Sequence, residues 1–130
     1  MYAIDTNVLI RYIVEDNFEQ AQKATEAIEQ LTPEKQGFIS CIVLCELNWV
    51  LKTAYKISKS KRVATLKKIL SVPVFEIEQL DCCLKALRSY DQGQADFSDY
   101  LIQQIGEEHG YDILLTFDRK ASRKTGFQGF

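Results

Sequence analysis

Short apolar segments alternate with longer amphipathic segments along this chain of 130 residues. Strands are predicted at residues 2–4, 37–40, 72–76 and 113–116, and helices at residues 6–13, 17–32, 41–56, 58–71, 79–90 and 96–109, with a short last helix beginning at Asp118. Because consecutive parallel strands need a crossover that returns the chain to the starting edge, this alternation favours a parallel sheet flanked by helices. We therefore expect an α/β fold, a three-layer α/β/α sandwich around a central parallel sheet of four to five strands.

The length and composition are those of one globular domain, and we expect a single domain over residues 1–130 with disorder only in the last few residues. The N-terminal segment has no basic region before an apolar stretch, and no apolar run is long enough to span a membrane. These features predict a cytoplasmic protein with no membrane association. The four cysteines show no CxxC spacing and the chain has one histidine, so a zinc site is not expected.

The net charge of −2 gives no support for a nucleic-acid partner, but the basic residues are unevenly distributed. Eleven of the 16 lie in two segments that contain no acidic residue, Lys52, Lys56, Lys59, Lys61, Arg62, Lys67 and Lys68 in the first, and Arg119, Lys120, Arg123 and Lys124 in the second. Solvated helix faces explain such clusters as well as a binding surface does.

Carboxylates follow several of the predicted strands, where parallel sheets bind ligands. Asp5 comes directly after the first strand, and Asp118 comes two residues after Thr116, which ends the fourth. Asp96 and Asp99 open the helix that feeds the fourth strand, so they are expected at the same edge. Helix capping is the alternative for each of these acids, and it accounts best for Asp96.

Glu46 lies within a helix in which almost every other position is apolar, with Ile42 and Val50 on its own face. A carboxylate buried on such a face needs a charge partner or a metal, unless the face simply reaches solvent. Like charges brought together at one edge repel each other unless a cation neutralises them. Asp5, Glu46, Asp99 and Asp118 are therefore the candidate ligands of a metal ion, with Asp96 as a further possibility.

Oxygen ligands without Cys or a well-placed His select Mg²⁺ or Mn²⁺, which suits phosphate chemistry. Such an ion can activate water and stabilise charge on a phosphodiester. Thr6 and Asn7 add oxygen donors beside Asp5. Arg119, Lys120, Arg123 and Lys124 would then lie beside the site and contact the phosphates of a nucleic-acid backbone. No Gly-rich nucleotide-binding loop follows a strand.

The chain resembles the PIN-domain ribonucleases, and especially the VapC-type toxins of toxin–antitoxin pairs. The segments that carry the resemblance are residues 4–9, Glu46, residues 95–102 and residues 115–121. It implies an α/β/α fold, a Mg²⁺- or Mn²⁺-dependent endoribonuclease, and a homodimer that an antitoxin silences. By position, Asp5, Glu46, Asp99 and Asp118 match the family's acidic quartet, and Thr6, Asn7 and Thr116 match its polar helpers. Tyr100 departs from the small residue often found there and either narrows the substrate channel or packs outside it.

Two other functions are compatible with some of these residues. A Mg²⁺-dependent phosphatase of the haloacid-dehalogenase type needs a second acid two residues after Asp5, where this chain has Asn7. A non-catalytic RNA- or protein-binding domain of the same fold stays open. We also expect a dimer or antitoxin surface on the helix over 41–56, whose apolar residues spread over more than one face: Leu44, Leu47, Trp49, Leu51 and Tyr55.

Overall fold

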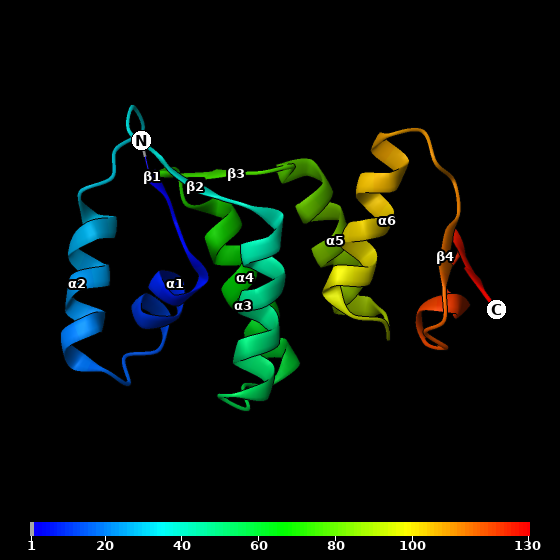
Figure 1. Cartoon of the computed structure of the whole chain (residues 1–130), viewed down its shortest axis with the longest axis horizontal. Coiled ribbons are helices and arrows are strands. Elements are labelled where there is room, and N and C mark those ends of the chain that lie inside the picture. The colour runs from blue at the N-terminus through cyan, green and yellow to red at the C-terminus, as the bar shows by residue number, and fades with distance from the viewer. Residues whose placement is uncertain (1) are drawn as a thin grey trace. The chain divides into compact units, whose positions relative to one another are not determined.

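The computed structural model describes residues 2–130, and these residues form an α/β structure with parallel strands, as the sequence predicts (Figure 1). The elements in chain order are β1 (Tyr2–Ala3), α1 (Thr6–Ile13), α2 (Phe18–Glu29), β2 (Gly37–Ile39), α3 (Cys41–Thr53), α4 (Lys59–Ser71), β3 (Phe75–Ile77), α5 (Leu80–Gln92), α6 (Phe97–Glu108), β4 (Leu114–Thr116), the 3-10 helix η1 (Ala121–Arg123) and β5 (Phe127–Gly129). All six predicted α-helices are confirmed, with ends that differ by a few residues. None of the helices in this described range is long and apolar enough to cross a membrane.

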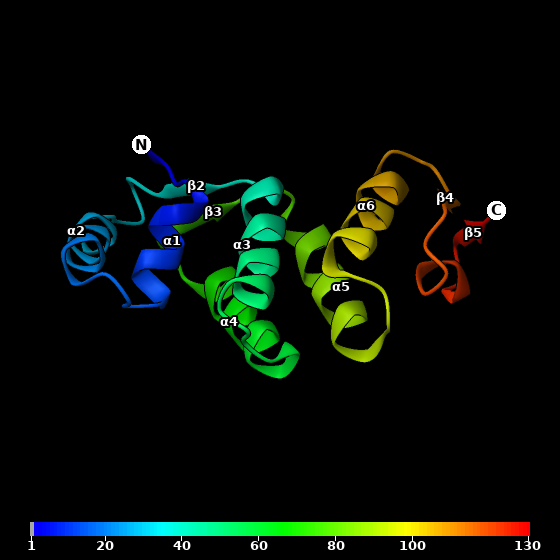
Figure 2. The ribbon, with the colours of Figure 1, turned by 60° about the horizontal axis from the view of Figure 1, so that its bottom comes forward.

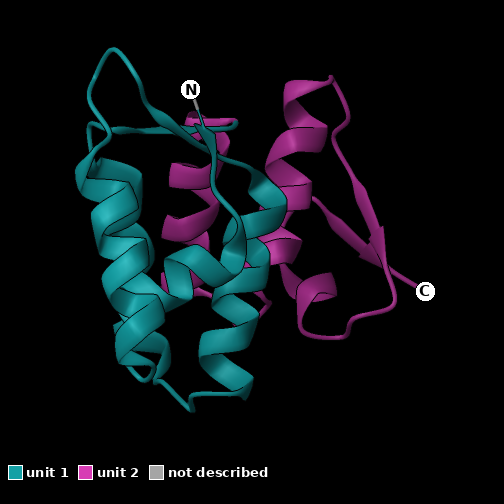
Figure 3. Cartoon of the chain, turned by 60° about the vertical axis from the view of Figure 1, so that its left-hand side comes forward, with its two compact units in different colours: residues 1–78 teal, residues 79–130 magenta. Residues whose placement is uncertain are grey.

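The chain divides into two compact units, which Figure 3 colours separately. Unit 1 comprises residues 1–78 and unit 2 comprises residues 79–130. The single domain over residues 1–130 stays a prediction.

Unit 1 contains a parallel sheet in the order β1-β2-β3. Tyr2 pairs with Gly37 of β2, and Phe38 of β2 pairs with Glu76 of β3. Its core consists mainly of aliphatic side chains with no exposed surface, among them Leu9 of α1 and Ile39 of β2. The carboxyl ends of the three strands therefore meet at one edge, where α1 and α3 begin.

Three of the leucines of α3 are buried, which corrects the expectation that they contribute to a partner surface. Leu44, Leu47 and Leu51 have no exposed surface and belong to the core. Helix α3 packs against α1 and α4, and a helix with two such neighbours buries more than one face. Trp49, at 65% exposed, and Ile42, at 71%, are the large apolar side chains that α3 leaves open to solvent.

A buried arginine joins α3 to α4. Arg62 is 6% exposed, and its Nε donates a hydrogen bond to Oδ1 of Asn48 at 3.1 Å. Its guanidinium also donates to the carbonyl oxygen of Ile57. Arg62 is thus part of the packing between two helices, which removes it from the basic surface predicted for this segment.

Unit 2 is built on α5 and α6, which pack side by side in Figures 1 and 2. The ring centroids of Tyr90 and Phe97 lie 6.0 Å apart between these helices. Helix α6 ends within a residue of the predicted position, and Gly110 follows it with φ +87°, a conformation that favours glycine after a helix.

The expectation of one sheet with four to five strands is wrong. Within the described residues β1, β2 and β3 form one sheet, while β4 pairs in parallel with β5, Leu114 opposite Phe127. Strand β5 was not predicted, because its residues were assigned to a disordered C-terminal tail. The segment Phe127–Gly129 is three residues long, has no apolar alternation and ends in glycine, so no periodicity marks it as a strand.

Candidate carboxylate site

Asp5 sits between β1 and α1, at the helix-capping position of α1. Its side chain accepts no capping hydrogen bond. By contrast, the side chains of Asn17, Ser40 and Ser58, which precede α2, α3 and α4, accept backbone N–H bonds in the usual way. Helix capping therefore does not explain why a carboxylate stands at position 5, because its oxygens accept no N–H bond from the first turn of α1.

Thr6 links the start of α1 to α3. Its Oγ1 donates a hydrogen bond to Oε1 of Glu46 at 3.0 Å, and Thr6 is only 6% exposed. A hydrogen bond to a carboxylate from a buried donor holds the carboxylate in place. This bond holds Glu46 against Thr6, the residue that directly follows Asp5.

Glu46 itself is exposed, which corrects the argument from burial. Its neighbour Ile42 on the same helical face is also exposed, so this face reaches solvent. No desolvation penalty forces a partner on Glu46. The feature that singles it out is the hydrogen bond from Thr6, a tertiary contact between residues 40 positions apart.

Thr6→Val tests this positioning role. The substitution keeps the side-chain shape and removes the hydroxyl, so Glu46 loses its donor while the fold keeps its packing. For the ribonuclease activity that the family resemblance implies, we expect RNA cleavage to fall about tenfold, as is typical for residues that orient ligands, with little change in the melting temperature. Thr53→Val is the control, because the hydroxyl of Thr53 contacts only the Trp49 carbonyl of its own helix; equal cleavage by both variants would contradict the role of Thr6.

In unit 2, Asp96 and Asp99 form a capping box at the start of α6. Asp99 Oδ2 accepts a hydrogen bond from the backbone N–H of Asp96 at 3.0 Å. Burial raises the pKa of Asp99 above its ordinary value, the bond from Asp96 lowers it, and the negative charges of Asp118 and Asp96 raise it further. Capping therefore involves both acids, and Asp99 in addition lies within the electrostatic field of Asp118.

Asp118 terminates β4 and begins the turn into η1. Its Oδ1 accepts backbone N–H bonds from Lys120 at 2.8 Å and from Ala121 at 3.1 Å. Thr116 Oγ1 accepts the N–H of Asp118 at 3.0 Å, so Thr116 fixes the backbone at this carboxylate. The bonds from Lys120 and Ala121 are both accepted by Oδ1 of Asp118, so this oxygen stabilises the turn, and Oδ2 takes part in neither bond.

Tyr100 packs inside unit 2. It is 2% exposed, its hydroxyl accepts the N–H of Ala95 at 3.2 Å, and its ring meets that of Phe127 edge-on. A Cβ on Gly93 would overlap this hydroxyl, so the glycine provides the space that the phenol needs. Of the two alternatives for the large residue at this position, packing within the unit is the one observed.

Glu78, which follows β3, is an acid that sequence analysis did not include in the site. Its Oε1 accepts the backbone N–H of Cys41 at 2.9 Å, at the start of α3. The signal for it was present, since Glu78 follows a strand as Asp5 does. Its carboxylate serves the first turn of α3, so it stabilises the helix start next to Ser40.

The basic residues predicted to contact RNA are all exposed and none of them forms an ion pair within residues 2–130: Arg119, Lys120, Arg123 and Lys124. The Nζ of Lys124 lies 6.0 Å from the centroid of the Tyr100 ring.

Cys45 is not a candidate nucleophile, because burial raises the pKa of its thiol to about 11.

The four predicted acids divide evenly between the units, Asp5 and Glu46 in unit 1 and Asp99 and Asp118 in unit 2. Asn7 follows Thr6 in α1 and is exposed. Within neither unit do three or more of the described His, Cys, Asp and Glu residues gather closely enough to hold an ion.

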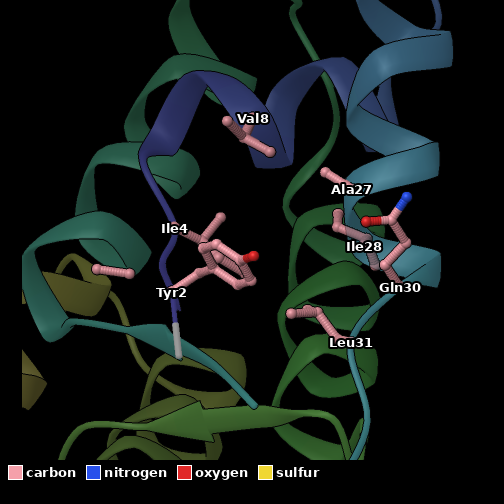
Figure 4. Close-up of a pocket in the computed structure, with 8 residues that line it drawn as sticks. Tyr2, Ile4, Val8, Ala27, Ile28, Gln30 and Leu31 are labelled. Carbon is pink, nitrogen blue, oxygen red and sulfur yellow. The ribbon is translucent and has the colours of Figure 1, made fainter. Parts of the chain in front are cut away.

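Unit 1 also contains a pocket of about 300 Å³ that is lined mainly by apolar side chains. Figure 4 shows Tyr2 and Ile4 across from Ala27 and Ile28 of α2 and from Leu31, which follows that helix. No acidic or basic residue lines this pocket. The pocket therefore includes none of the candidate acids, and it offers no carboxylate ligand for a cation.

The chain is similar to known proteins along most of its length. The family model of the PIN domain matches residues 2–126. A VapC ribonuclease from Aquifex aeolicus (strain VF5) is 24% identical over 129 residues, and the alignment covers 98% of this chain and 94% of that protein. The family model covers the positions of all four candidate acids.

Proposed function

Since this chain belongs to the PIN-domain family, we propose that it is a Mg²⁺- or Mn²⁺-dependent endoribonuclease and the toxin of a toxin–antitoxin pair. The similarity to a VapC ribonuclease along almost its whole length supports this proposal. The fold alone would not, because one fold serves many functions. The support has to come from the site residues.

The observation that carries the proposal is that each unit positions two of the candidate acids. Thr6 holds Glu46 by a hydrogen bond, and the preceding Asp5 has a carboxylate that is not used for capping. Burial raises the pKa of Asp99, and the negative charge of Asp118 raises it further. Carboxylates kept close to like charge are unfavourable for stability alone, and a bound cation offsets that repulsion.

The donor set fits Mg²⁺ or Mn²⁺. We propose Asp5, Asp99 and Asp118 as ligands, with Glu46 at the same site, and all four offer only oxygen atoms. Asp96 belongs to the helix start, since it contributes to the capping box. A divalent ion bound there would supply an activated water and charge stabilisation at the phosphate.

The residues around the acids have distinct roles in this proposal. Thr6 orients Glu46, Thr116 fixes the backbone of Asp118, and Asn7 offers a further polar group beside Asp5. The basic residues after Asp118 bind the RNA backbone, because the carboxylates alone would repel phosphates. These cations are Arg119, Lys120, Arg123 and Lys124.

The proposal includes partners other than RNA. A toxin of this kind is silenced by a cognate antitoxin and acts in the cytoplasm, commonly as a homodimer. The exposed Ile42 and Trp49 of α3 offer an apolar surface for the antitoxin or for a second copy. Leu44, Leu47 and Leu51 are not part of that surface, because they are buried in the core.

The test is cleavage of a mixed cellular RNA pool by the purified chain in Mg²⁺, in Mn²⁺ and in EDTA. We expect discrete fragments with either ion and none with EDTA, since chelation removes the group that activates water. Addition of excess Mg²⁺ after EDTA should restore the same fragments. Identical cleavage in EDTA would contradict metal dependence, and no cleavage under any condition would favour a non-catalytic binding domain.

A further inference from the structure

Two phenylalanine rings lie stacked on the surface of unit 2. The ring centroids of Phe117 and Phe130 are 4.5 Å apart with an interplanar angle of 21°. Phe117 is 84% exposed and Phe130 is 79% exposed. Stacked aromatic rings usually lie in a core or an interface, so a pair this open to solvent is costly without a partner.

The register of the two strands creates this pair. Thr116 of β4 is paired with Gly129 of β5, and each is followed directly by one of the phenylalanines. Parallel pairing therefore brings Phe117 and Phe130 side by side at the carboxyl ends of β4 and β5. The same end of β4 carries Asp118, the residue after Phe117.

The charge around this pair differs from that of the whole chain. Residues 111–130 contain four basic residues and two acidic ones, a difference of +2, whereas the chain carries −2. Arg119 and Lys120 follow Asp118 directly, and both are exposed. A flat aromatic surface next to cations that have no ion-pair partner in the described residues matches the bases and phosphates of a single strand.

We propose that Phe117 and Phe130 form a stacking platform for one nucleobase of a single-stranded RNA that is cut beside Asp118. This inference deepens the proposed function and rests on it. Because the two rings already touch, the base adds to an outer face of the stack rather than entering between them. The phosphates on either side of that base contact Arg119 and Lys120.

A protein partner is the other occupant that an exposed aromatic pair suggests. The charge decides against it, because the centre of a protein interface is usually depleted of charged residues. Here Asp118 and Lys120, residues of the two kinds that such interfaces deplete, lie one and three residues from Phe117 and are exposed. Nucleic acid uses cations and aromatic rings together, and a base presents a π face whatever its sequence.

The test is equilibrium binding of short labelled single-stranded RNA to the full chain in EDTA, which prevents cleavage. A set of strands of equal length is measured in parallel. Each strand carries one abasic site, at a different position, so that all phosphates stay and one base is lost. The variants are Phe117→Leu, Phe117→Trp and Phe130→Leu. Phe18→Leu is the matched control, because Phe18 is 83% exposed and lies in unit 1.

We expect Phe117→Leu and Phe130→Leu each to weaken binding about tenfold, as loss of one base stack does. Phe117→Trp keeps a ring and should bind at least as tightly as the unmodified chain. One abasic position should weaken binding to the unmodified chain by a similar factor and have no effect on Phe117→Leu. Phe18→Leu should bind normally.

Equal affinities for Phe117→Leu and Phe18→Leu would overturn the platform, as would an abasic effect that persists in Phe117→Leu. A change of oligomeric state in Phe117→Leu with unchanged RNA affinity would show that a protein covers the rings instead. Cleavage with Mg²⁺ separates this proposal from the proposed function. If Phe117→Leu binds and cleaves RNA like the unmodified chain, the platform fails while the nuclease stands.

Discussion

Asp5→Asn is expected to lower RNA cleavage about a thousandfold while the protein stays folded. Asn keeps the shape of the side chain and removes the negative charge that a divalent ion requires. A metal contributes several kcal/mol to a reaction of this kind, and each 1.36 kcal/mol is a factor of ten in rate. Because the carboxylate of Asp5 accepts no capping bond, the substitution removes no contact that stabilises α1.

The measurement is the initial rate of fragment formation at saturating Mg²⁺, together with a thermal melt of the same sample. Asp91→Asn is the control, since Asp91 is an exposed carboxylate of α5 outside the proposed site. A rate for Asp5→Asn close to that of Asp91→Asn would refute the role of Asp5. A lowered melting temperature would instead trace the loss to folding.

Asp99→Asn should change activity and stability in opposite directions. We expect cleavage to fall about a thousandfold, for the same reason as at Asp5. In EDTA we expect a higher melting temperature than that of the unmodified chain. The raised pKa of Asp99 means that its charge is unfavourable in the folded state, and an amide oxygen can still accept the N–H of Asp96.

The pH dependence follows from the same shift. A carboxyl group with a raised pKa binds its proton more tightly in the folded state than in the unfolded state. Its contribution to stability therefore grows as the pH falls through the raised pKa of Asp99 and is lost as the pH rises again. The stability gained by Asp99→Asn should be largest at neutral pH and should disappear in acid.

Mg²⁺ supplies a second readout for Asp99. A ligand that binds only the folded state raises the melting temperature, so Mg²⁺ should stabilise the unmodified chain more than Asp99→Asn. Asp96→Asn is the matched control, because Asp96 opens the same helix. If Asp96→Asn loses the Mg²⁺ effect and Asp99→Asn keeps it, the assignment of the ligand within this turn is reversed.

Helix positions could be predicted from sequence because their signals are local. Asn17, Ser40 and Ser58 cap the helices that follow them, and Gly110 ends α6. Asp5, Asp99 and Asp118 could be named for a similar reason, since they stand close after a strand or at a helix start, whereas Glu46 was named from the apolar positions around it. The family resemblance rests on these same positions, and the family match confirms it.

Other expectations failed because they depend on what a residue packs against. The apolar residues Leu44 and Leu47 have the same pattern whether a partner or the core covers them, and here the core does. Burial of Glu46 was inferred from its apolar neighbours, yet that face of α3 reaches solvent. A periodic pattern shows that a face is apolar without showing what lies opposite.

The α/β class and the helices could be predicted from the sequence, because capping, periodicity and strand ends are encoded within a few neighbouring positions. The same local signals made the four acidic residues candidates for the site. Tertiary structure alone decided that β4 pairs with β5, that Thr6 binds Glu46 and that Phe117 stacks on Phe130. Each of these contacts joins residues that are 12 or more positions apart. Such contacts form when the folded backbone brings those residues together, and local sequence patterns do not specify them.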